Sequence, residues 1–142
     1  MPSQPQTLLL VRHQQAVARL YGVLTDQLPR TADIWRRLQA ESLCQASRLN
    51  ALANDIKAGR EELDAGHVGA ALQKSTASIE AQTKLWFITG VKPRAALQYA
   101  WGMENSFLEQ RLFATRDGDS VLVRQLLDSL QQNTRNHMAR LA

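Results

Sequence analysis

The sequence predicts an all-α protein: four helices arranged as two antiparallel hairpins, with a long and partly helical crossover between the hairpins. Three observations predict this fold. Leu and Ala carry most of the apolar content, and the 142 residues include 6% aromatic residues, seven Gly and four Pro, a composition typical of helices. Apolar residues recur at steps of three and four in several long stretches. Turn signals separate these stretches by short gaps inside each pair and by residues 58–92 between the pairs.

The first pair of helices is expected at residues 7–25 and 31–57. The first helix carries apolar side chains at helical steps along one face, and Pro29 ends it because a proline disfavours helical backbone at the preceding residue. Thr31 or Asp33 is expected to cap the second helix through its side-chain oxygen. The inward face of the second helix is polar at its centre, and its expected members are Ile34, Trp35, Leu38, Ser42, Gln45, Leu49 and Leu52.

The crossover is expected over residues 58–92. Gly59 supplies a stop for the helix before it, and Asp64-Ala65-Gly66-His67 is a turn signal. Helical propensity returns over 68–89, so part of the crossover is expected to be helical. Its expected inward residues are Ala71, Leu72, Ile79, Leu85 and Trp86.

The second pair of helices is expected at residues 95–115 and 121–141. Gly90-Val91-Lys92-Pro93 breaks the chain before the pair, and the polar segment 116–120 is the tight turn inside it. Because each hairpin has a short loop and the crossover is long, the expected topology is a four-helix bundle with one long crossover. The expected inward residues are Leu97, Ala100, Trp101, Glu104, Leu108, Leu112, Val123, Leu126, Leu127, Leu130, Thr134, His137 and Leu141.

Length and charge restrict the class of protein. A chain of 142 residues is expected to form one domain, 1–142. The single cysteine, Cys44, excludes an intrachain disulfide, fits a reducing compartment and is expected in the core rather than as a reactive thiol. The apolar run 8–11 is too short for a signal peptide or a membrane span, so a cytoplasmic protein is expected. The net charge of +4 is scattered along the chain, which indicates a solvated surface and no nucleic-acid partner.

A weak internal repeat supports the two hairpins. Residues 19–21 (Arg-Leu-Tyr) match residues 111–113 (Arg-Leu-Phe), and the pairs Leu38-Gln39 and Arg48-Leu49 recur in the same ungapped register, 92 residues later. The matches fall at corresponding places in the two proposed hairpins, as a duplicated hairpin requires.

Four features carry a family resemblance: Tyr21, Trp35-x-x-Leu38, Ala96-Leu97-x-x-Ala100-x-x-x-Glu104 and His137-x-x-x-Leu141. With their order and spacing, the chain resembles the rubrerythrin-like branch of the ferritin-like superfamily over roughly residues 7–141. The resemblance implies a bundle that holds two iron ions, with one Glu from each of helices one and three and Glu-x-x-His from each of helices two and four.

Most of the positions that the resemblance assigns to iron carry other residues here. Helix one has Gln14, helix two has Ser42 and Gln45, and helix four has Thr134, where the family has metal ligands. Two of the six positions keep a ligand, namely Glu104 and His137. A second register for helix two would use Glu41 and Cys44 instead; the repeat favours the first register because it aligns Gln45 with His137.

Two interpretations of the remaining polar residues follow. In the first, Glu104 and His137 bind each other, since mutual pairing offsets the desolvation of a buried carboxylate and imidazole. In the second, Glu104 and His137 remain metal ligands in an atypical site. Glu41 is then a third ligand, and Cys44 or His13 is a candidate for a fourth. His13 itself is expected at the helix surface or partly buried.

The expected function is therefore a non-catalytic binding or structural role in a bundle that has lost its di-iron chemistry, without a cofactor. The expected partners are a second copy, as a homodimer, or an unknown protein. The alternative is an iron-dependent oxidoreductase with an atypical site. No nucleophile elbow, phosphate-binding glycine loop or His-Glu-x-x-His motif is present in the sequence.

Overall fold

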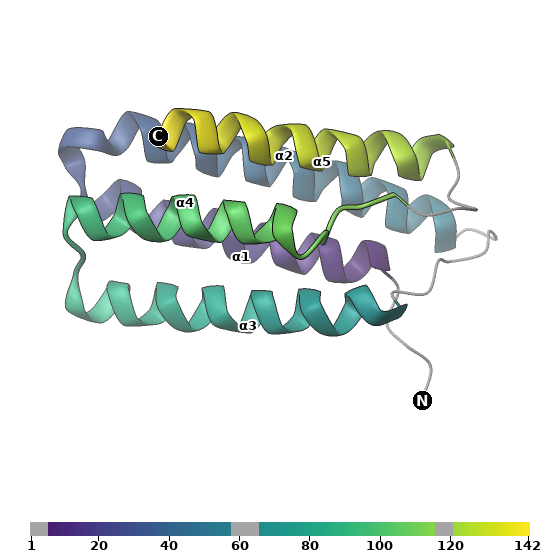
Figure 1. Cartoon of the computed structure of the whole chain (residues 1–142), viewed down its shortest axis with the longest axis horizontal. Helices are drawn as coiled ribbons and strands as arrows, with labels where there is room; N and C mark the ends of the chain where they lie inside the picture. Colours follow the sequence, from purple (N-terminus) through teal and green to yellow (C-terminus); the bar gives the residue numbers. More distant parts are fainter. Residues whose placement is uncertain (1–5, 58–65, 116–120) are drawn as a thin grey trace. The chain divides into compact units, whose positions relative to one another are not determined.

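The computed structural model describes residues 6–57, 66–115 and 121–142, and this part of the chain is helical without any strand. The predicted all-α class is confirmed. Figure 1 shows the helices, and their bounds are α1 Gln6–Gln27, the short 3-10 helix η1 Pro29–Thr31, α2 Ala32–Lys57, α3 Gly66–Thr89, α4 Pro93–Glu109 and α5 Val121–Leu141. The expected partly helical crossover thus contains a helix of 24 residues, α3.

The chain divides into two compact units, Met1–Gly90 and Val91–Ala142. The first unit holds α1, α2 and α3, and the second holds α4 and α5. None of the helices in the described part of the chain is long and apolar enough to cross a membrane.

Helix α1 is the centre of the first unit, because it contacts both α2 and α3 (Figure 1). It runs antiparallel to α2, since Tyr21 near its end stacks on Trp35 near the start of α2, with ring centroids 5.9 Å apart. Packing on two sides buries more than one stripe of α1. The buried residues of α1 are Gln6, Thr7, Leu9, Leu10, Val11, His13, Gln14, Ala16, Val17, Ala18, Leu20, Tyr21 and Leu24.

Helix α3 runs parallel to α1 and returns the chain along the length of the first hairpin. Two side-chain hydrogen bonds fix this direction: His13 near the start of α1 pairs with Ser75, and the Gln27 Nε2 at its end donates to the Trp86 carbonyl at 2.6 Å. Partner residues advance together along both helices, as parallel packing requires.

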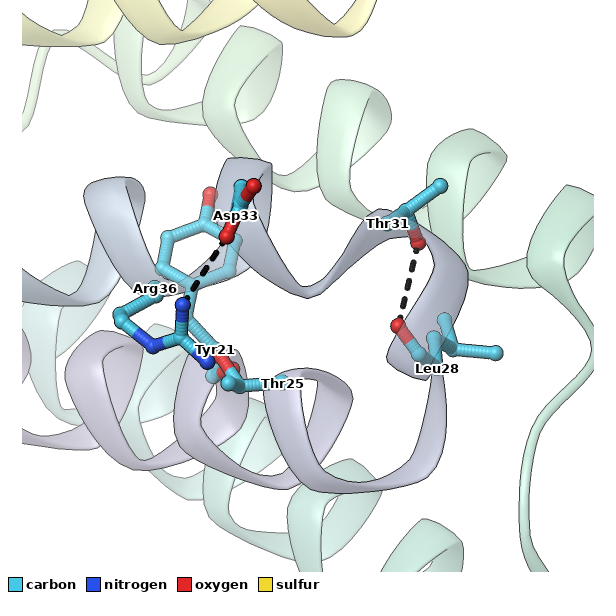
Figure 2. Close-up of polar contacts among 6 residues, drawn as sticks. All are labelled: Tyr21, Thr25, Leu28, Thr31, Asp33 and Arg36. Atoms are coloured by element: carbon cyan, nitrogen blue, oxygen red, sulfur yellow. Dashed lines mark hydrogen bonds and ion pairs between the residues drawn. The ribbon is translucent and has the colours of Figure 1, made fainter.

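The link between α1 and α2 is a tight polar turn (Figure 2). Helix α1 stops before Pro29, as predicted, and the Leu28 N–H still donates to the Leu24 carbonyl at 3.0 Å. The Thr31 hydroxyl donates to the Leu28 carbonyl and accepts from the Trp35 Nε1 at 3.0 Å. Thr31 therefore orients a buried indole instead of serving as the helix cap expected from the sequence.

Helix α3 ends in a left-handed glycine, which confirms the break expected at Gly90–Pro93. Gly90 has φ of 77°, and its N–H donates to the Trp86 carbonyl at 2.9 Å, the αL form of helix termination. Pro93 then begins α4, with Lys92 before it in extended backbone. Proline suits this first helical position because its missing N–H would have no helical partner there.

In the second unit α4 and α5 pack antiparallel, because Glu104 contacts His137 and the Gln131 side chain donates to the Phe113 carbonyl at 2.9 Å. Helix α4 ends at Glu109, so the expected helix at 95–115 was too long.

The early end of α4 has a clear backbone cause. Arg111 has a left-handed φ of 55°, its N–H donates to the Leu108 carbonyl, and the Leu112 N–H donates to the Phe107 carbonyl, each at 3.1 Å. This pair of bonds is a Schellman cap. The turn returns Leu112 and Phe113 to the interior, where the rings of Phe107 and Phe113 meet edge-on. Because this position usually carries glycine, the arginine gave no stop signal in the sequence.

Several residues expected to face inward are exposed instead. Ile34, Leu85, Leu97 and Trp101 are 39%, 52%, 36% and 40% exposed. Cys44, expected in the core, is also exposed. Helical spacing identifies a stripe of apolar residues along a helix. Each stripe is wider than the strip of helix surface that neighbouring helices bury, so residues at its edges stay exposed.

Candidate functional site

The second unit contains a buried acid–imidazole pair. Glu104 lies on α4 and His137 on α5, and the His137 Nδ1 is 3.0 Å from the Glu104 Oε2. The two residues are 2% and 1% exposed. A carboxylate oxygen and an imidazole nitrogen at this distance form a hydrogen bond when one of the two carries a proton. The structure therefore shows the pairing that the first interpretation of these residues predicts.

Thr134 adds a hydroxyl on the same buried face. It lies one turn before His137 on α5, a spacing that places both side chains on one side of the helix, and it is 2% exposed. Glu104, Thr134 and His137 thus share the packed face of the α4–α5 hairpin, which is the inward face that the sequence predicts.

The first unit carries the other expected positions. Gln14 on α1 is 4% exposed, and Ser42 and Gln45 on α2 are 0% and 7% exposed. The expectation of an inward face with a polar centre on α2 is confirmed. The Ser42 hydroxyl makes no hydrogen bond within the described part of the chain. These side chains are neutral, so burying them needs no compensating charge.

The second register for α2 lies on a more exposed face. The Glu41 side chain is 29% exposed, and its Oε1 is 3.5 Å from the Nε of Arg37, one turn earlier. Cys44 is exposed. Glu41 and Cys44 therefore lie away from the deeply buried positions Ser42 and Gln45.

His13 is a buried polar residue that sequence reasoning placed wrongly at or near the surface. It is 0% exposed, and its Nε2 is 2.9 Å from the Ser75 hydroxyl oxygen on α3. Burial lowers the pKa of His13 from 6.5 to about 3, because a charged imidazole would lose its hydration. The ring is therefore neutral at pH 7. The available signal was its place one turn from Leu10 and Val17, within the apolar stripe of α1.

The His13–Ser75 contact has the geometry of a nucleophile and its base, yet its electrostatics oppose that chemistry. A general base works best with a pKa near the operating pH, and the pKa of His13 is about 3. The contact instead joins α1 to α3 inside the first unit.

The donor set does not fit a di-iron centre. Within the described ranges, no three or more His, Cys, Asp or Glu residues are grouped so that they could hold a metal ion. The implied ligand positions hold two amides, two hydroxyls and one mutually bonded Glu104–His137 pair. Two iron ions require several carboxylates to neutralise their charge, and these six positions offer one, Glu104.

Comparison with known proteins identifies no relative. No family profile matches the chain, and neither a curated protein nor a solved structure is significantly similar to it.

Proposed function

We propose that this chain is a ferritin-like bundle of the rubrerythrin-like kind in which neutral polar side chains have replaced the di-iron ligands, and that it has a binding or structural role. The observation that carries the proposal is the Glu104–His137 contact of 3.0 Å. The only carboxylate and the only imidazole at the six implied ligand positions bind each other.

The arrangement inside each unit supports the proposed fold. α1 with α2, and α4 with α5, are antiparallel hairpins, and α3 returns along α1 to the end of the first unit near Gln27. A ferritin-like bundle needs two hairpins and one connection that travels the length of a hairpin. Helix α3 supplies that connection in helical form.

Electrostatics support the loss of iron chemistry. Two divalent cations held by one carboxylate and one imidazole would leave uncompensated positive charge among buried residues, which costs several kcal/mol or more. Gln14, Ser42, Gln45 and Thr134 offer hydrogen-bonding groups without charge, and they are all buried. Such residues suit a polar interior that needs no metal to stabilise it.

The test is elemental analysis of untagged protein expressed with iron, manganese and zinc supplied, together with melting in the presence of a chelator. We expect less than about 0.1 metal ion per chain and an unchanged melting temperature, because metal that stabilised the fold would raise it. The matched comparison is the double variant Glu104→Leu/His137→Leu, which should give the same metal content and the same response to chelator.

Two outcomes would contradict the proposal. About two metal ions per chain, lost together with thermal stability on chelation, would restore an iron-dependent oxidoreductase with an atypical site. About one ion per chain, absent from the double variant, would identify Glu104 and His137 as a mononuclear site.

A further inference from the structure

A groove follows the surface of the first unit between α1 and α3. Its volume is about 630 Å³, and Gln39 of α2 also lines it. The residues of α1 that line it include two small ones, Ala16 and Gly22. A Cβ added at Gly22 would lie 2.6 Å from the Gln39 Nε2, so glycine also allows the Gln39 side chain to lie across the helix.

One large aromatic side chain is exposed at this groove. Phe87 lines it and is 74% exposed. Leu85 and Ile88, on the same final turns of α3, are 52% and 72% exposed. They do not line the groove, because residues one or two positions from Phe87 lie on other sides of the helix. An exposed aromatic ring at the edge of a hollow offers apolar surface to a partner.

The charges of the groove are balanced. Arg19 and Glu80 form an ion pair across it, with 3.5 Å between nitrogen and oxygen. Asp26 on the α1 wall and Lys84 on the α3 wall also line it, and neither makes an ion pair with any residue in the described ranges. The groove thus offers one unpaired charge of each sign.

We propose that a second copy of this chain occupies the groove in a two-fold symmetric dimer. Each copy inserts Phe87 into the groove of the other, and Asp26 of each copy pairs with Lys84 of the other. A two-fold axis brings the same patch of both copies together, so every contact occurs twice and the patch must complement itself. A patch with an exposed aromatic ring, a hollow and one unpaired charge of each sign meets this condition.

A second copy fits this surface better than a charged partner does. The chain has a net charge of +4, so two copies carry the same net charge and repel each other at long range. The groove has two cationic and two anionic side chains among its lining residues, and it is therefore a place where two copies meet without like-charge repulsion. This proposal is independent of whether Glu104 and His137 bind metal.

Sedimentation equilibrium on the full chain tests the dimer. We expect wild type to dimerise at or below about 100 µM, and Phe87→Ser to weaken dimerisation about a hundredfold because two phenyl rings lose their buried environment in each dimer. The matched control is Val121→Ser on α5, since Val121 is 72% exposed and lies in the other unit. This control should dimerise as wild type does.

Charge reversal tests the geometry. Asp26→Lys or Lys84→Asp alone should weaken the dimer at least tenfold, and the double reversal should restore it, because the pair then has the opposite polarity. Thermal melting of each variant confirms that it is folded. Three results would overturn the proposal. The first is a wild type that sediments as a monomer up to about 1 mM. The others are equal weakening of the dimer by Phe87→Ser and Val121→Ser, and a double reversal that weakens the dimer further. Groove binding of a neutral apolar dye to a wild type that stays monomeric would identify a small-molecule pocket instead.

Discussion

His13 should make the protein sensitive to acid. Its pKa is about 3 in the folded chain against 6.5 for an unperturbed histidine, because the ring is buried on α1 against Ser75. Between these values the unfolded chain binds a proton that the folded chain does not. Stability therefore rises with pH across this window. The contribution of His13 is complete above pH 6.5 and is lost progressively as the pH falls toward 3.

The size of the effect follows from the two pKa values. One pKa unit corresponds to about 1.4 kcal/mol, so the difference between 6.5 and about 3 corresponds to roughly 5 kcal/mol in total. At pH 5 the loss relative to pH 8 is about 2 kcal/mol, and at pH 4 it is about 3 kcal/mol. A domain with a stability of about 5 to 15 kcal/mol would lose a large fraction of it.

The variant His13→Gln isolates this contribution. Gln keeps a hydrogen-bonding group near Ser75 and cannot gain a proton in this range. Urea unfolding of both proteins at several values between pH 8 and pH 4 gives the difference in free energy of unfolding at each pH. Groups that the substitution does not touch contribute equally to both proteins and cancel. The difference should therefore move in favour of the variant by about 2 kcal/mol between pH 8 and pH 5.

A difference that stays constant over this range would refute the reasoning. It would mean that His13 gains a proton as readily in the folded chain as in the unfolded one, and hence that the ring is hydrated. Direct NMR titration of the ring gives an independent reading: its signals should not shift between pH 8 and pH 5 if the pKa is about 3.

Three further predictions concern stability and are measured by urea unfolding at pH 7. His137→Leu should cost about 3 to 5 kcal/mol because it strands the buried Glu104, whereas adding Glu104→Leu should recover most of the loss; an additive loss would contradict the pairing. Arg111→Gly should stabilise the chain by about 1 kcal/mol by relieving its left-handed backbone, and Arg111→Ala, which keeps a Cβ, should bring no such gain. Thr31→Val should cost about 1 to 2 kcal/mol because the buried Trp35 Nε1 loses its acceptor; an unchanged midpoint would show that water replaces it.

The helix ends show where sequence signals sufficed. Pro29 and Gly90 mark breaks that the structure contains, because each residue limits the backbone by its own covalent geometry. At Arg111 the backbone is left-handed, as it is at Gly90, yet the residue type predicts continued helix. The burial of Leu112 and Phe113 accompanies the turn, and this tertiary packing could not be inferred from the residues on either side.

The polar residues show the same division. The three-residue spacing of Ser42 and Gln45, and of Thr134 and His137, predicted that each pair shares a helix face, and all four are buried. The distance between Glu104 and His137 could not be inferred from the sequence, because it depends on how α4 and α5 align along each other. From the sequence, His13 was expected at or near the surface. Its depth of burial depends on α3, which is distant in sequence and packs against α1 at Ser75.

By itself the sequence determined the helical class, the breaks at proline and glycine, and which polar residues share a face, because these features depend on backbone geometry and on the helical period. The tertiary structure alone decided which stripes are covered. It buried His13 as a neutral ring, brought Glu104 to 3.0 Å from His137, and left Cys44 and Phe87 exposed. Burial and pKa depend on contacts between helices that are distant in the chain, and local sequence does not encode those contacts residue by residue.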